Sequence, residues 1–233
     1  MDRSIKLWSG SALAYVDSLF GHQQEALCID ASRNERLVTG GMDRSVRFWK
    51  IPEESQLVFR ARSMVTESVA FVTQSQWVSG DQDGCVCLYT NTQKKPTATI
   101  RGAHPRNPPE ADAPGCADSQ CAEWVTSVAA ARGTDLVASG AGNGVIRLWR
   151  AAGEPGKGGV TGLSPVGAIA ARGFVNAIAL GVGGRVLFAG IGQEPRTGRW
   201  ARDKAARNGV LVHVLDEETG GDDKDDDDEE DEE

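Results

Sequence analysis

The 233-residue sequence contains no long hydrophobic run and no pattern of paired cysteines. No stretch of eighteen apolar residues occurs, so we expect neither a transmembrane helix nor a membrane partner. The first residues do not show the basic-then-apolar pattern of a secretory signal. The five cysteines are odd in number and irregularly spaced, which does not fit a disulfide framework and favours a reducing compartment.

Motifs for catalysis, metal binding and cofactor binding are also missing. The glycine-rich run 153–158 lacks the spacing of a phosphate-binding loop and the Ser or Thr that follows its lysine. Cys85 and Cys87 have no His or Cys partners at zinc-binding spacing, so we expect them to pack in a core. The sequence therefore predicts a protein that is not an enzyme and holds no metal or cofactor.

The net charge of −8 conceals a strong segregation of charge along the chain. Residues 216–233 contain fourteen acidic residues and one lysine. The remaining residues contain 19 acids against 24 bases, of which eighteen are arginine. An arginine-rich body is compatible with phosphate contacts, although a net charge of +5 is weak support for RNA binding.

A seven-residue pattern, Asp43-Arg44-Ser45-Val46-Arg47-Phe48-Trp49, recurs along the chain. Similar runs begin at Asp2, Asp83 and Asn143, with a degenerate copy at Asn208. The last residues of these runs are Trp8, Trp49, Tyr89, Trp149 and Val214. A period near 40 residues with a turn acid and a terminal Trp is typical of WD40 β-propeller blades, and the two longer intervals indicate insertions.

This pattern predicts an all-β fold of roughly seventeen short strands in residues 1–215. A closed seven-bladed propeller needs about twenty-eight strands, so we expect an incomplete propeller of about four to five blades. Met1–Ser4 aligns with Met42–Ser45, which implies that the chain starts inside a blade. Residues 216–233 are too acidic to bury a core and are expected to form a disordered tail.

The best-formed repeat resembles other WD40 blades in four polar positions. The resemblance implies a buried hydrogen-bonded tetrad of His22, Thr39, Asp43 and Trp49, in which each polar group satisfies another. The third repeat has Arg60-Ala61-Arg62 where a Gly-His pair is expected, and Asn143 replaces the aspartate in the fourth. We expect lower local stability in these later repeats.

Two insertions, at about residues 104–123 and 192–207, are the most informative features for function. The second carries Arg196, Arg199, Trp200, Arg202, Lys204 and Arg207. Basic residues around an aromatic suit RNA, with guanidinium groups on phosphates and an indole on a base. A solvated loop with Trp200 packed on the rim explains the same residues equally well. Both insertions should lie on one face of the propeller.

The opposite face should carry Glu53, Glu54 and Gln56, between the third and fourth strands of the best repeat. Their charge suits a protein partner better than phosphate. A salt bridge at the rim is the simpler alternative.

Two stretches, Lys50–Phe59 and Gly192–Trp200 with 206–208 behind it, go beyond a generic propeller. They resemble the WD-repeat subunit of the U3 small nucleolar ribonucleoprotein, and the similarity covers about residues 1–215, corresponding to the C-terminal part of that family. The resemblance implies a non-catalytic, nucleolar subunit that binds the box B/C region of U3 snoRNA beside the kink-turn-binding protein of box C/D particles. It further implies association with the small-subunit processome during pre-rRNA processing and 18S rRNA maturation.

The family's N-terminal blades and basic N-terminal region have no counterpart in this sequence, and the acidic tail is not covered by the resemblance. A second function therefore stays open. Most propellers bind proteins or peptides, and fold alone does not fix function. The alternative is a WD40 scaffold for protein–protein interaction that makes no direct RNA contact.

Overall fold

The structure, a computed structural model, describes residues 2–61, 65–105, 123–153 and 159–215. In these ranges the regular elements are β-strands and one short 3₁₀ turn, η2 (Val182–Gly184). No helix of the described ranges is long and apolar enough to cross a membrane.

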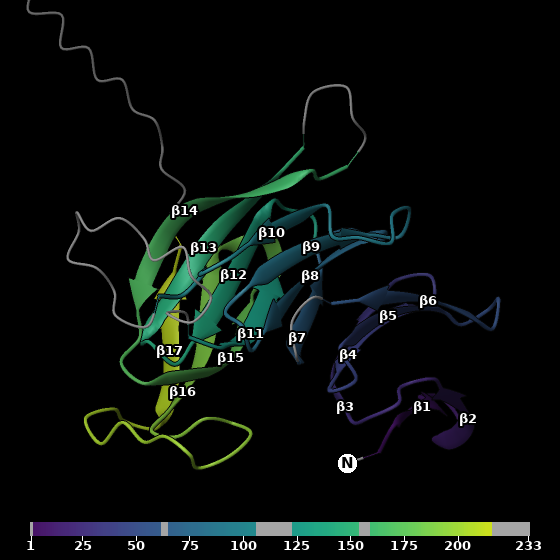
Figure 1. Cartoon of the computed structure of the whole chain (residues 1–233), viewed down its shortest axis with the longest axis horizontal. Helices are drawn as coiled ribbons and strands as arrows, with labels where there is room; N and C mark the ends of the chain where they lie inside the picture. Colours follow the sequence, from purple (N-terminus) through teal and green to yellow (C-terminus); the bar gives the residue numbers. More distant parts are fainter. Residues whose placement is uncertain (1, 62–64, 106–122, 154–158, 216–233) are drawn as a thin grey trace, which may run out of the picture.

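The described residues form seventeen strands in five antiparallel sheets, each built from consecutive strands (Figure 1). The first sheet holds β1 (Ser4–Ser9) and β2 (Ala14–Phe20). The second holds β3 (Ala26–Ser32), β4 (Arg36–Gly41), β5 (Ser45–Lys50) and β6 (Ser55–Arg60). The third holds β7 (Thr66–Phe71), β8 (Gln76–Asp81), β9 (Val86–Thr90) and β10 (Ala98–Ile100). The fourth holds β11 (Val125–Ala130), β12 (Leu136–Ala141), β13 (Val145–Ala152) and β14 (Gly162–Ala170). The fifth holds β15 (Phe174–Leu180), β16 (Val186–Gly192) and β17 (Gly209–Val214).

The recurring seven-residue pattern forms the turn between the second and third strands of a sheet, followed by the third strand. Its second residue is Arg44, Gly84 or Gly144, with φ angles of 58°, 73° and 72°. A left-handed residue at this point reverses the chain tightly, which explains the glycines at positions 84 and 144. The β-branched and aromatic residues that follow favour an extended strand.

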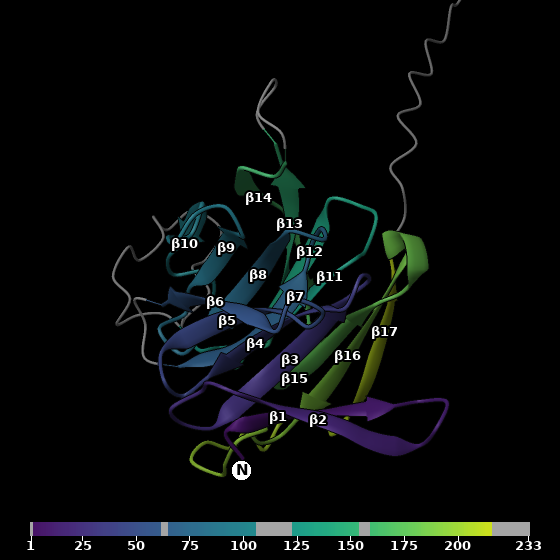
Figure 2. The same cartoon turned by 90° about the vertical axis from the view of Figure 1, so that its right-hand side faces the viewer.

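Successive sheets pack face to face through their first strands, as β3, β7, β11 and β15 show in Figure 2. A glycine of the second strand makes this approach possible. A Cβ atom on Gly40 would lie 2.5 Å from the Thr66 side chain, and one on Gly80 would lie 2.5 Å from Val125. Glycine at this position, three residues before the turn residue in Gly40–Asp43 and Gly80–Asp83, is therefore a packing requirement.

An aromatic cluster joins the second and third sheets. Trp77 is fully buried and stacks on Phe48 and Tyr89, with ring centroids 5.1 Å and 5.9 Å apart. Phe59 and Phe71 meet the Trp77 ring edge-on. Large aromatic side chains dominate core energetics, so these rings hold the two sheets together.

The structure confirms the predicted all-β WD40 architecture, with sheets of two, four, four, four and three strands. The described residues contain seventeen strands, in agreement with the number expected. β13 and β14 extend beyond the tight turns of the other sheets and pair as far as Ala152 and Gly162. The tail at 216–233 and most of the insertion at 104–123 lie outside the described residues.

Candidate nucleic-acid and partner interface

The two insertions meet on one face of the molecule, here called the loop face. The loop between β16 and β17 carries Trp200, and Trp124 follows the first insertion directly. Their ring centroids lie 5.3 Å apart with a tilt of 53°. The described end of the first insertion thus lies against the second one. A hollow of about 250 Å³ is lined there by both indoles together with Phe174 and Pro195.

The four residues proposed as a tetrad lie together beneath this face. The Trp49 indole N–H donates to the Thr39 hydroxyl at 2.9 Å, and His22 Nε2 lies 2.8 Å from the same oxygen. His22 Nδ1 lies 3.0 Å from an Asp43 carboxylate oxygen. Because the Thr39 oxygen accepts from the indole, its own proton is available for Nε2. The network therefore places the imidazole proton on Nδ1, where it donates to Asp43.

Burial lowers the pKa of His22 below its usual value, although the neighbouring Asp43 carboxylate acts in the opposite direction. Asp43 has a lowered pKa: burial raises it, but hydrogen bonds from Ser45 and Gln23 and the proximity of His22 outweigh that effect. A neutral imidazole and a carboxylate anion are the states that this network favours. The group is structural, since its polar atoms are turned toward one another.

A second such network exists in the fourth sheet, and the sequence interpretation missed it. His104 is fully buried, with Nε2 2.8 Å from the Ser139 hydroxyl and Nδ1 3.4 Å from the Asn143 side-chain oxygen. The Trp149 indole donates to the same hydroxyl at 2.8 Å. For this repeat the sequence interpretation noted only the replacement of Asp by Asn143 and assigned no role to His104. One feature of the sequence could have revealed this network. The spacing from Ser139 to Trp149 is ten residues, which equals the spacing from Thr39 to Trp49.

Arg196 anchors the second insertion. Its guanidinium donates to the Glu67 carbonyl at 3.0 Å and lies 3.3 Å from the Glu67 carboxylate. Its backbone N–H donates to the Asn176 side chain at 2.8 Å. Glu67 is 3 % exposed on β7, whereas Arg196 belongs to the fifth sheet. The structure thus places Arg196 in an intramolecular ion pair between distant sheets.

Replacing Arg196 by alanine is expected to lower the free energy of unfolding by about 1 to 2 kcal/mol, because the buried Glu67 carboxylate loses its cation while Arg196 itself is partly solvated. Urea denaturation measures the change. Arg199→Ala is the matched control, since the Arg199 side chain is 88 % exposed. A loss that is equal in both variants would contradict the anchoring role.

The other basic residues of the loop remain near the surface. Arg199 and Arg202 share Glu194, at 3.2 Å and 3.8 Å, and both are largely exposed. Lys204 and Arg207 are exposed as well, and so is half of Trp200. The loop therefore presents four cations and one half-exposed indole on the loop face, against two acidic residues, Glu194 and Asp203.

The candidates on the opposite face do not form one cluster. Glu53 makes a two-bond ion pair with Arg36. Gln56 accepts from Arg47 at 2.7 Å and donates to the Phe20 carbonyl at 3.3 Å. Glu54 is exposed at a turn with a positive φ of 47°. Two of the three side chains are thus occupied within the chain.

The described cysteines lie in the core or at its margin. Burial raises the pKa of the Cys28 and Cys85 thiols to about 12 and that of Cys87 to about 11. Thiols in this state are poor nucleophiles. Within the described ranges, no group of three or more His, Cys, Asp or Glu residues is arranged to hold a metal ion.

Comparison with known proteins agrees with this architecture. The family described as "WD domain, G-beta repeat" matches residues 14–50 and 117–150. Two solved structures, titled "Structure of U3-55K" and "Crystal structure of RRP9 WD40 repeats", superpose with a TM-score of 0.80 each. They are 40% and 39% identical to this chain, cover 91% and 92% of it, and are themselves covered over 62%. The chain is a WD40-repeat protein.

The sequence relatives narrow the class further. U3 snoRNP-associated protein-like EMB2271 of Arabidopsis thaliana is 38% identical over 214 residues, which are 92% of this chain and 43% of that protein. U3 small nucleolar RNA-interacting protein 2 of Mus musculus is 42% identical over 163 residues, 70% of this chain and 32% of that protein. The chain is a relative of the U3 snoRNP WD-repeat proteins and spans less than half the length of these curated relatives.

Proposed function

We propose that this chain is a non-catalytic WD40 subunit of the U3 snoRNP that binds U3 snoRNA through its loop face and acts in pre-rRNA processing. Arg199, Arg202, Lys204 and Arg207 surround the exposed Trp200 there, and this single arrangement carries the proposal. Guanidinium and ammonium groups neutralise phosphates, while an indole offers a surface for an unstacked base.

The relatives' names support the same role. They include U3 small nucleolar RNA-interacting protein 2 and, at 26% identity over 275 residues, Ribosomal RNA-processing protein 9 of Saccharomyces cerevisiae. The family resemblance of the Lys50–Phe59 and Gly192–Trp200 stretches implies, within this proposal, that the RNA target is the box B/C region of U3, bound beside the kink-turn-binding protein of box C/D particles. Its other partners in this proposal are proteins of the small-subunit processome. The protein would act in the maturation of 18S rRNA and be located in the nucleolus.

Arg196 has a different part in this proposal from the one its sequence suggests. Its pairing with Glu67 holds the loop in place, so phosphate contacts fall to Arg199, Arg202, Lys204 and Arg207. The pairing of Arg199 and Arg202 with Glu194 is solvent-exposed and costs little to exchange for phosphate.

Neutralising Arg199 and Arg202 together, as Arg199→Gln and Arg202→Gln, is expected to weaken U3 RNA binding about tenfold and to lower the slope of log affinity against log salt by about 1 to 2. The matched control is Lys94→Gln with Lys95→Gln, which removes two charges from an exposed turn at the opposite face. The measurement is a salt titration of a labelled box B/C stem with the full chain and the kink-turn-binding protein. Equal effects of the two pairs would refute a loop-face contact.

A protein-binding scaffold without RNA contact is the second candidate, favoured by the aromatic hollow of Trp124, Phe174, Pro195 and Trp200. Crosslinking and sequencing of bound RNA in cells separates the two functions. Enrichment of U3 RNA at box B/C, lost in the Arg199/Arg202 variant with protein partners retained, supports the RNA role. RNA recovery no higher than for an unrelated propeller, with partners lost on Trp200→Ala, supports the scaffold.

A further inference from the structure

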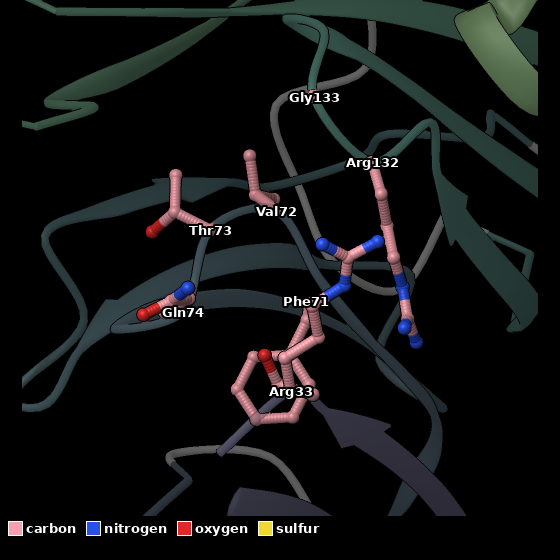
Figure 3. A pocket seen from close by; sticks show the side chains of 8 residues that line it. Arg33, Phe71, Val72, Thr73, Gln74, Arg132 and Gly133 are labelled. Atoms are coloured by element: carbon pink, nitrogen blue, oxygen red, sulfur yellow. The ribbon is translucent and has the colours of Figure 1, made fainter.

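A basic hollow of about 400 Å³ opens on the face opposite the loop face. It lies where the first strands of three sheets turn into the second strands. We call it the arginine hollow and define it by Arg33, Thr73, Gln74 and Arg132. Figure 3 shows the two arginine side chains entering one opening from turns of different sheets, with Thr73 and Gln74 on a third turn.

The polar contacts around the hollow leave it positive. Arg132 reaches from the fourth sheet to the second, donating to Asp30 at 2.8 Å and to the Ala31 carbonyl at 2.7 Å. The other Asp30 oxygen accepts from the Phe71 backbone N–H at 2.8 Å, so that carboxylate is held from both sides. Arg33 makes no hydrogen bond or ion pair with the residues that the structure describes. None of the described lining residues is acidic.

The acidic end of the chain starts on this same face. Leu215, the last described residue, donates its backbone N–H to the Arg185 carbonyl at 2.7 Å, in the turn between β15 and β16. Gly184 in that turn lies against Ala131 and Thr134, which flank Arg132 and Gly133. Leu215 therefore lies one sheet away from the arginine hollow, at the end of β17 away from the loop that joins β16 and β17 (Figure 1).

We propose that the arginine hollow binds the chain's own acidic segment, residues 216–233. The segment holds fourteen acids and one lysine in eighteen residues, and a carboxylate can accept two parallel hydrogen bonds from one guanidinium. Eighteen extended residues reach up to roughly 60 Å, so length does not limit the contact. Covalent attachment gives a local concentration on the order of millimolar, so a weak electrostatic site is filled.

This contact does not depend on the proposed RNA role, because it occupies the other face. It masks the arginine hollow until a more strongly acidic ligand competes. It also keeps the tail's negative charge away from the cations of the loop face, which leaves these free for phosphate. High salt should open the hollow, since Arg33 is exposed to solvent and its attraction to carboxylates is screened by salt.

Carbodiimide crosslinking of the full chain tests this proposal. The reagent couples amines to carboxylates, so Arg33→Lys places a reactive amine at the hollow without changing the charge. Mass spectrometry of the products is expected to show tail-to-position-33 crosslinks several times more often than tail crosslinks to Lys94 or Lys95, exposed lysines of the same face. Mixing isotope-labelled and unlabelled chains distinguishes coupling within one chain from coupling between two.

The matched control is Arg199→Lys, which offers the same amine on the loop face. Within-chain crosslinks from position 33 that disappear at high salt support the proposal. Crosslinks that are no more frequent at position 33 than at Lys94, Lys95 or position 199 overturn it. Crosslinks that form only between chains also overturn the proposal, because the hollow is then a site for an acidic segment of another molecule. Failure of RNA binding in the Arg199/Arg202 variant leaves this result unaffected.

Discussion

Replacing Thr39 by valine is expected to lower the free energy of unfolding by about 2 to 4 kcal/mol. Valine matches threonine in shape, so little packing is lost. The hydroxyl, however, bonds both the Trp49 indole and the His22 imidazole, at 2.9 Å and 2.8 Å. Its removal leaves two buried polar groups without a partner, each costing about 1 to 3 kcal/mol.

Urea denaturation followed by tryptophan fluorescence measures this loss, and the chain offers a close control. Thr66 is 1 % exposed on β7, and its hydroxyl has no hydrogen-bond partner among the described residues. Thr66→Val should therefore change stability by less than about 0.5 kcal/mol or raise it slightly. Equal destabilisation by the two substitutions would show that the β-strand environment, and not the tetrad, sets the cost.

The sequence predicted the architecture well because each blade is a local unit. The turn at Asp43–Ser45, the glycine three residues before it and the terminal Trp all lie within one short stretch. Their spacing is imposed by a tight turn and by contact with the next sheet. These constraints recur in the second, third and fourth sheets, with Tyr89 in place of Trp in the third, so the strands there could be predicted with small errors in their ends. In the fifth sheet an insertion separates Gly190 from Asn208.

The arrangement of the candidate sites could be predicted only in part, because long-range contacts leave no spacing signal. His104 lies 35 residues before its Ser139 partner, whereas His22 lies 17 before Thr39. The insertion between them hides the equivalence. Arg196 pairs with Glu67 across 129 residues, and Arg132 pairs with Asp30 across 102. Both pairings follow from sheets that face one another, which residue types alone do not reveal.

The two long-range ion pairs each connect sheets that are second neighbours along the chain. Arg196–Glu67 links the fifth sheet to the third near the loop face, and Arg132–Asp30 links the fourth sheet to the second at the opposite face. Nearest-neighbour packing connects only adjacent sheets, so these pairs connect sheets that are second neighbours. Arg196–Glu67 should contribute the larger share of the stability, because the Glu67 carboxylate is buried, whereas the Arg132 side chain of the other pair is largely exposed.

Lowering the pH from 6.5 toward 4 is expected to remove about 3 kcal/mol of stability through His104 alone. Burial, with Arg147 nearby, lowers the pKa of His104 to about 4, from an ordinary value of 6.5. The unfolded chain therefore takes up a proton at a pH where the folded protein does not. The stabilisation is complete above pH 6.5 and is lost progressively as the pH falls to the folded-state pKa. His22 acts in the same direction, since its pKa is lowered too.

Urea denaturation at half-unit steps between pH 7 and pH 4.5 measures this slope. The Asp43 carboxyl titrates below its ordinary value of 3.8, so its contribution is lost at lower pH and does not explain a slope in this window. His104→Gln is the informative variant, because an amide can still bond the Ser139 hydroxyl but cannot titrate. It should be less stable than the natural chain at pH 7, and its stability should fall less steeply from pH 6.5 to 5, because the contribution of His22 remains. A natural chain whose stability is flat over that range would mean that His104 is protonated in the fold, and the network with Ser139 and Trp149 would then have to be reassigned.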